Sequence, residues 1–180
     1  MVYVHFAQGF EEVEALTCID VMRRAGIEAV MVSMTGEKIV KSVRNIGIQT
    51  DILFEEADYE SCEMIVLPGG MPGAKNLGEH EGLVQHIKDF SANGKWIAAI
   101  CAAPMVFGHN GLLTGKKATI YPGMEEHLIG AAYSTDRVAV DGNVITSKGP
   151  GTAMEFAVTI VELLKGKALA EKLKNDLVMI

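Results

Sequence analysis

The sequence predicts an α/β fold: a doubly wound, mostly parallel sheet covered by helices on both faces, with short β-hairpins. Three observations lead to this expectation. Short apolar runs rich in β-branched residues alternate with longer runs of helical periodicity. The apolar runs are mostly uninterrupted, which is typical of parallel strands buried on both faces. Glycines follow the helical runs at the points where helices are expected to end.

Five apolar runs are expected to form strands, at residues 2–7, 29–34, 64–67, 96–100 and 118–121. Asp141-Gly142 is a strong two-residue turn signal, and it predicts a hairpin between residues 137–140 and 143–147. Arg44-Asn45 is expected to join a second hairpin, from residues 38–43 to residues 47–50.

Four runs of helical periodicity are expected at residues 11–25, 83–92, 103–108 and 152–164. Gly26, Gly94 and Gly166 are expected to end three of them. In a sheet of this kind, ligands bind outside the carboxyl ends of the central strands. Candidate functional residues are therefore sought in the loops that follow those strands.

Composition limits the classes of function. The length of 180 residues suits one domain, expected to span residues 1–180. The net charge is −7 and no basic run occurs, so neither nucleic acid nor a membrane surface is an expected partner. Three widely spaced cysteines favour a reducing compartment, and the first residues resemble a strand more than a leader peptide, so a cytoplasmic location is expected. No spacing of metal ligands is found, and neither a metal nor a cofactor is expected.

Cys101 is the leading candidate for a reactive residue. It directly follows the apolar run 96–100 and precedes Ala102-Ala103-Pro104, and proline favours the first turn of a helix. This spacing predicts a sharp strand-to-helix turn at the cysteine. A helix terminus lowers a thiol pKa by at most about 1.5 units, so a mostly ionised thiol needs further hydrogen-bond donors. The alternative is that Cys101 is a small buried apolar residue.

Glu14 is the second candidate. At 100° per residue it lies on the same stripe of the first helix as Cys18, Val21 and Ala25, so its carboxyl faces the core. Burial and a neighbouring thiolate would both raise its pKa, and a protonated carboxyl can donate a hydrogen bond to sulfur. The alternative is a solvated glutamate at the start of the helix.

Two glycine loops are further candidates. The amides of Gly69 and Gly70, which end the run 64–67, can form half of an oxyanion site, with the amide of Ala102 as the other half. Gly149 and Pro150 precede the last long helix and can line the same cleft, with Thr152 as an N-cap. Both loops are equally compatible with plain turns.

Taken together, these motifs resemble the ThiJ/PfpI superfamily, and within it the branch of the parkinsonism-associated protein "DJ-one" and bacterial YajL. The resemblance covers nearly the whole chain and rests on four segments in order: Gln8-Gly9-Phe10-Glu11-Glu12-Val13-Glu14, Leu67-Pro68-Gly69-Gly70, Ala99-Ile100-Cys101-Ala102-Ala103-Pro104 and Ser147-Lys148-Gly149-Pro150-Gly151-Thr152.

The resemblance implies a flavodoxin-like, class I glutamine amidotransferase-like domain, and a homodimer. It also implies an oxidation-prone cysteine at Cys101, a protonated glutamate at Glu14 and a glycine amide at Gly70 that faces the sulfur. Arg44 and Arg24 match arginines near the site in relatives, the second contributed across the dimer. Two departures stand out: Tyr121 occupies the position where glyoxalase-type relatives often have histidine, and Ala102 the position where the protease-like branch has histidine.

Two functions follow as hypotheses. In the first, the Cys101 thiolate adds to a small aldehyde such as methylglyoxal, Glu14 shuttles a proton, and Tyr121 contacts the substrate, giving lactate or a repaired glycated protein. In the second, the protein is a non-catalytic redox sensor or chaperone, and peroxide oxidises Cys101 to sulfinate. A Cys–His–acid protease is not expected, because no histidine is suitably placed.

The first helix, residues 11–25, provides an argument for the dimer that does not depend on the resemblance. Leu16 and Ile19 lie opposite its core stripe, and a helix that is apolar on both sides needs a second partner. The alternative is that both are ordinary exposed apolar side chains.

Overall fold

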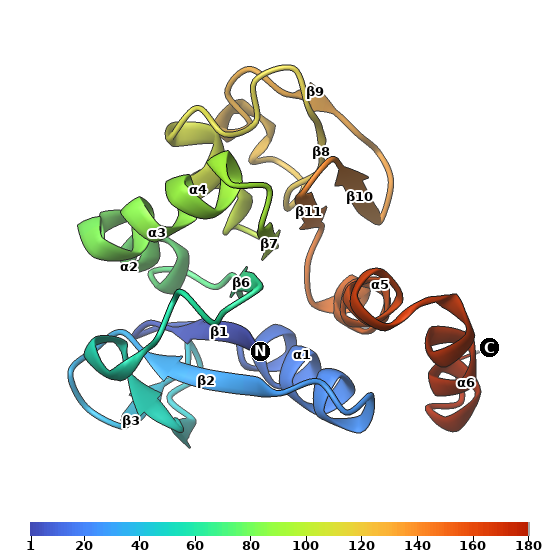
Figure 1. Cartoon of the computed structure of the whole chain (residues 1–180). Coiled ribbons are helices and arrows are strands. Elements are labelled where there is room, and N and C mark those ends of the chain that lie inside the picture. Colours follow the sequence, from blue (N-terminus) through green and yellow to red (C-terminus); the bar gives the residue numbers. More distant parts are fainter. Residues whose placement is uncertain (180) are drawn as a thin grey trace.

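The computed structural model describes residues 1–179, arranged as a central sheet with helices on both faces (Figure 1). The main sheet has the strand order β10-β11-β7-β6-β1-β2-β5. Its strands are β1 (Val2–Phe6), β2 (Ala29–Ser33), β5 (Ile52–Leu53), β6 (Met64–Leu67), β7 (Trp96–Ile100), β10 (Val138–Asp141) and β11 (Val144–Ser147). All neighbours in this sheet are parallel except β10 and β11, which form the predicted antiparallel hairpin. The predicted fold class is therefore confirmed.

Alternate side chains of each central strand enter two separate cores. Val4, Val66 and Ala98 pack under α1 (Glu12–Arg24) and α5 (Ala153–Lys165). Tyr3 precedes Val4 in the sequence and Ile65 precedes Val66. Both face the opposite core, under α2 (Gly73–Glu79), α3 (Glu81–Ala92) and α4 (Pro104–His109). In Figure 1, α1, α5 and the terminal α6 (Lys167–Asp176) accordingly lie on one side of the strands, and α2, α3 and α4 on the other.

Smaller elements complete the fold. A two-stranded hairpin joins β3 (Ile39–Lys41) to β4 (Gly47–Gln49), as predicted, with Asn45 in the left-handed region at its turn. Short 3-10 helices are η1 (Phe54–Glu56), η2 (Glu125–His127) and η3 (Pro150–Thr152). No helix within residues 1–179 is both long and apolar enough to cross a lipid bilayer.

The expected strand at residues 118–121 is wrong. Only Lys117–Ala118 (β8) is extended, and it pairs with β9 (Ala132–Tyr133) in a separate small sheet. Beyond it, the Thr119 amide donates to Thr146 Oγ1 and the Tyr121 amide to the Cys101 carbonyl. These groups satisfy the backbone without a neighbouring strand, and β10 already pairs with β11 at the end of the main sheet.

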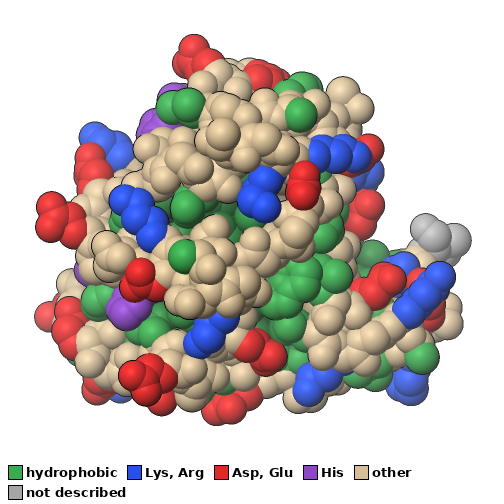
Figure 2. Space-filling view, turned by 45° about the horizontal axis from the view of Figure 1, so that its top comes forward, with side chains coloured by type: hydrophobic (Ala, Val, Ile, Leu, Met, Phe, Trp, Pro, Cys, Tyr) green, Lys and Arg blue, Asp and Glu red, His purple; other side chains and the backbone are tan. Residues whose placement is uncertain are grey.

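The prediction for the outer face of α1 is half wrong. Leu16 is 36% exposed, but Ile19 is only 6% exposed and belongs to the core under α1. Val13, at 50% exposure, is the second outward apolar residue of this helix. Figure 2 shows acidic and basic side chains interspersed with apolar ones on the face that it presents.

Candidate active site

Cys101 forms the sharp turn between β7 and α4 that the sequence predicts. Its φ is +64°, a conformation that few residues other than glycine adopt. Its amide donates to the Ser147 carbonyl at 2.9 Å, and its carbonyl accepts from the Tyr121 amide at 2.9 Å. These two contacts fix the strained turn at the carboxyl end of the central strand, where Cys101 as a residue is 8% exposed.

Glu14 reaches the same point from the first turn of α1. It is fully buried, and its Oε2 accepts a hydrogen bond from the Gly69 amide at 2.8 Å. Its Oε1 is buried without a hydrogen-bond partner among the described residues. A buried carboxylate oxygen without a partner is energetically costly, which favours a carboxyl that is protonated or shares a proton with a neighbouring group.

Gly69 lies between the Glu14 carboxyl and the Cys101 thiol. Because it has no side chain, these two groups can come close to each other. A Cβ at this position would lie 2.5 Å from Cys101 Cβ and 2.8 Å from Glu14 Oε2. Any side chain here would therefore displace one group or the other. Because the Gly69 amide is bonded to Glu14, it serves the carboxyl and not the sulfur.

The acid and the thiol perturb each other. Burial raises the pKa of Glu14 to about 7, and the hydrogen bond from the Gly69 amide opposes this rise. Burial also raises the pKa of Cys101 to about 12, and the negative charge of Glu14 adds to it. The amides of Gly70 and Ala102, which face the sulfur, lower the pKa of Cys101.

The pair therefore titrates as a unit that carries at most one negative charge near neutral pH. Burial raises the pKa of both groups, and a negative charge on one of them disfavours a charge on the other. A thiolate at Cys101 beside a protonated Glu14, as the resemblance implies, stays a prediction. Burial of the sulfur opposes it and the amides of Gly70 and Ala102 favour it, through their effects on the pKa of the thiol.

Cys101 opens into a cavity of about 200 Å³. Its lining is mostly apolar: Gly70, Met71, Cys101, Ala102, Tyr121 and Met124. Met71 and Tyr121 are about half exposed. The cavity lining contains no histidine, so Tyr121 stands at the position where the family resemblance leads one to expect an imidazole.

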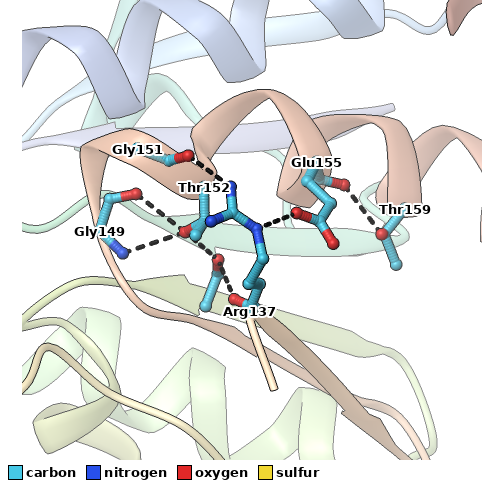
Figure 3. A network of polar contacts seen from close by, with 7 residues as sticks. Arg137, Gly149, Gly151, Thr152, Glu155 and Thr159 are labelled. Carbon is cyan, nitrogen blue, oxygen red and sulfur yellow. Dashed lines mark hydrogen bonds and ion pairs between the residues drawn. The ribbon is translucent and has the colours of Figure 1, made fainter. Parts of the chain in front are cut away.

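Gly149 supports Tyr121 from behind. A Cβ at Gly149 would lie 3.3 Å from the Tyr121 ring, whereas Pro150 is exposed and does not line the cavity. Thr152 occupies the N-cap position of α5, as predicted, but its side chain makes no capping hydrogen bond to that helix. Instead, Thr152 Oγ1 accepts from the Gly149 amide at 3.1 Å (Figure 3). The same oxygen lies 2.7 Å from Ser147 Oγ.

Arg137 fastens the same loop to the sheet and to α5. Its Nε lies 2.6 Å from Glu155 Oε2 and its Nη2 donates to the Gly151 carbonyl at 2.7 Å, as Figure 3 shows. The contacts of Thr152 and Arg137 thus fix the loop that contains Gly149. This loop contributes to the cavity by supporting the ring of Tyr121.

Arg44 and Arg24 are placed differently. Arg44 Nη1 lies 3.2 Å from Glu11 Oε1, and the other oxygen of Glu11 caps α1 by accepting from the Glu14 amide at 2.9 Å. Arg44 therefore reaches the site through Glu11, a connection that the sequence analysis missed. Arg24 pairs with Asp20 at 2.7 Å, ten residues beyond Glu14 and roughly 15 Å along the helix, so a single chain does not bring it to the cavity.

The other two cysteines are unsuited to reaction. Cys18 and Cys62 are each about 1% exposed, and burial raises the pKa of both thiols, that of Cys62 to about 11. Cys101, by contrast, is a free thiol that lines the cavity described above.

Several known proteins are similar in sequence to this chain. The chain is 39% identical over 180 residues to a zebrafish (Danio rerio) protein named Parkinson disease protein 7 homolog, covering 98% of this chain and 95% of that one. It is 33% identical over 168 residues to the Caenorhabditis elegans protein named glutathione-independent glyoxalase DJR-1.2, covering 93% and 89%. It is 42% identical over 167 residues to the Arabidopsis thaliana protein DJ-1 homolog B, with 92% of this chain covered, but it spans only 38% of that relative's length.

Solved structures of known proteins are also similar to this chain. The structure of oxidized Toxoplasma gondii DJ-1 matches with a TM-score of 0.94 and 38% identity, covering 98% of this chain and 97% of that one. The model of the DJ-1/PfpI family matches residues 1–163. The chain belongs to the DJ-1/PfpI family.

Proposed function

We propose that the chain is a cysteine-dependent stress-response enzyme of glyoxalase or protein-deglycase type that acts on small 2-oxoaldehydes. One observation carries the proposal: Cys101 lines an accessible, mostly apolar cavity, and the buried Glu14 carboxyl lies on the other side of Gly69 from it. The relative named glutathione-independent glyoxalase DJR-1.2 supports the choice of reaction.

The first step is addition. The Cys101 sulfur attacks the aldehyde carbon of methylglyoxal while its proton passes to the ionised Glu14, so the buried pair never holds two negative charges. The carbonyl oxygen becomes an oxyanion near the Gly70 and Ala102 amides, which face the sulfur. Glu14 then returns the proton to that oxygen, which gives a hemithioacetal and an ionised carboxyl.

The second step is a proton transfer between carbons. Glu14 removes the proton of the former aldehyde carbon while the neighbouring carbonyl oxygen is protonated, which gives an enediol. It then delivers a proton to the neighbouring carbon as the first hydroxyl loses its own, which gives the lactoyl thioester. Water cleaves the carbon–sulfur bond, releases lactate and restores the thiol. The sum is methylglyoxal plus water to lactate, so no external oxidant or cofactor is required. Tyr121 contributes a hydroxyl at the cavity that can orient the substrate.

Turnover of methylglyoxal tests the scheme. We expect Cys101→Ala to abolish lactate formation, and Glu14→Gln to lower its rate by about 10²-fold or more, as for loss of a general acid–base group. Glu55→Gln, at an exposed glutamate of η1, is the matched control and should retain full activity. If Cys101→Ala consumed methylglyoxal at the wild-type rate, the proposal would be wrong.

The pH dependence of Cys101 alkylation tests the role of the acid separately. In the wild type the carboxylate accepts the thiol proton, so the iodoacetamide rate should rise through about pH 7, where Glu14 ionises. In Glu14→Gln this rise should vanish, leaving only a rise at more alkaline pH, because burial still raises the pKa of the thiol. Identical profiles for the two proteins would exclude Glu14 as the proton acceptor.

A redox sensor is the second candidate, and one observation favours it. The amides of Gly70 and Ala102 face the sulfur and could stabilise an oxidised, anionic cysteine. The T. gondii relative is described as oxidized in its solved structure. Intact mass after dilute peroxide should show two added oxygens on Cys101 if this function holds, with no lactate formed from methylglyoxal.

A homodimer is the proposed assembly. Val13 and Leu16 on α1 and Val43 and Ile46 in the β3–β4 turn are exposed apolar side chains. The turn lies beside the first turn of α1, because the Val43 amide donates to the Phe10 carbonyl at 2.8 Å. We name these four residues the α1 patch. A second copy on this patch would cover it and could bring Arg24 of the partner toward the site.

A further inference from the structure

His109 and His127 form a pair at the end of α4 that is remote from Cys101. His109 is the last residue of α4, and His127 is the last residue of η2. His109 Nε2 lies 3.0 Å from His127 Nδ1, and the ring planes are inclined by 61°. Neither residue has a part in the proposed reaction.

The backbone fixes the separation of the two rings. A Cβ at Gly108 would overlap the carbonyl oxygen of His127 and lie 3.0 Å from the Ile129 amide nitrogen. The end of α4 and the segment that carries His127 are therefore in direct backbone contact. Leu128, next to His127, is buried in the core. The rings consequently project from two anchored segments and not from mobile loops.

The surroundings favour one arrangement of protons. His127 Nε2 lies 3.9 Å from the carboxylate of Glu126. A carboxylate on that side favours a proton on Nε2, which leaves the lone pair of His127 Nδ1 directed at His109. This lone pair accepts the hydrogen bond from His109 and becomes a metal ligand once that proton is displaced. The Glu126 carboxylate acts on His127 through its charge, because 3.9 Å is too long for a hydrogen bond.

We propose that His109 and His127 bind a first-row divalent transition-metal ion, with water completing the coordination. Imidazole nitrogens bind such ions at about 2.0–2.1 Å, so two of them lie about 2.9 Å apart at a 90° angle and about 3.3 Å apart in a tetrahedron. The separation of 3.0 Å fits adjacent positions of an octahedral or square-planar ion such as Ni²⁺.

Binding requires that the shared proton leave the line between the two nitrogens and that the rings turn so that both lone pairs point at the ion. The proton of His109 Nε2 moves to Nδ1 of the same ring, so both imidazoles remain neutral. Within residues 1–179 no group of three or more histidine, cysteine, aspartate or glutamate side chains is arranged around a metal position, so the site has two protein ligands. His109 also borders a cavity of about 160 Å³ beside Glu79 and Met105, which offers room for bound water.

Calorimetric titration of the full, untagged chain with Ni²⁺ tests the proposal. We expect one equivalent to bind to the wild type. His109→Asn and His127→Asn should each weaken binding by about tenfold or more, since even loss of a group behind a ligand has an effect of this size. Binding by these variants at the wild-type affinity, or absence of binding to the wild type, would overturn the proposal.

Two controls distinguish this site from others. His86→Asn removes a histidine that stacks on Tyr59, far along the chain from the pair, and should bind Ni²⁺ as the wild type does. Cys101→Ser should also retain binding, and its loss there would assign the metal to the cysteine and refute the histidine site. The melting temperature provides a second readout: added Ni²⁺ should raise it in the wild type and in His86→Asn but not in His127→Asn.

Discussion

At the scale of single residues, the site depends on one acid that the fold keeps away from water. Glu14 is fully buried, and the hydrogen bond from the Gly69 amide offsets part of the cost of removing the carboxylate from water. The sequence predicts an inward carboxyl from the helical stripe that Glu14 shares with Cys18, Val21 and Ala25. Which partner keeps the proton is not predictable in this way, because it depends on how deeply the sulfur is buried.

Glu14 should destabilise the fold at neutral and alkaline pH. Its pKa is about 7 in the folded protein and near 4.5 in the unfolded chain, so the folded state holds the extra proton between these values. The free energy of unfolding should therefore fall as pH rises from 4.5 to 7, by up to about 3 kcal/mol from this group. Urea denaturation at several pH values should show Glu14→Gln more stable than wild type at pH 8 and a smaller difference at pH 5.

The same denaturation series can also contradict this prediction. If Glu14→Gln followed the pH dependence of the wild type in parallel, the buried carboxyl would not be the group that binds the proton. Glu55→Gln, at an exposed position, should track the wild type throughout.

At the scale of elements, helices and strands with a long, regular sequence pattern were predictable. Segments whose conformation depends on contacts with other parts of the chain were not. The run at residues 118–121 is apolar enough for a strand, yet Thr146 and Cys101 satisfy its amides in place of a ladder. Helix α2 was missed because Gly73 and Gly78 weaken its helical propensity. Gly73 is needed there, since a Cβ would lie 2.7 Å from the backbone of Gly9.

The loop after β6 should tolerate no side chain at its first glycine. In Gly69→Ala the new Cβ would contact both Cys101 and Glu14 Oε2 within 3 Å, so we expect a loss of stability of about 1–3 kcal/mol. The rate of Cys101 alkylation should fall as well, because the carboxyl and the thiol are forced apart. Stability is measured by urea denaturation and the rate with iodoacetamide.

Gly151→Ala is the matched control for this change. No atom lies within 4 Å of a Cβ at Gly151, and its backbone is not in the left-handed region. It should leave both measurements near the wild-type values. If Gly69→Ala matched Gly151→Ala in both, the close approach at Gly69 would have no role in the site.

At the scale of the whole molecule, the two layers of helices determine which surfaces remain for a partner. The helices α1 and α5 pack together over one face of the sheet, and the core takes up Ile19 between them. The sequence assigns Ile19 to the outer face of α1, an error that arises because periodicity does not show how far a neighbouring helix extends. The α1 patch is what remains exposed after this packing.

Leu16→Glu should split the proposed dimer. A carboxylate at the centre of the α1 patch would be buried without a partner on association, so the equilibrium should shift to monomers. Light scattering at micromolar concentration should give twice the chain mass of 19.4 kDa for the wild type and the single mass for the variant. Leu163→Glu is a close control, because Leu163 on α5 is 37% exposed and Leu16 is 36% exposed. A wild type of single mass, or dissociation by Leu163→Glu as well, would show that the α1 patch does not hold two copies together.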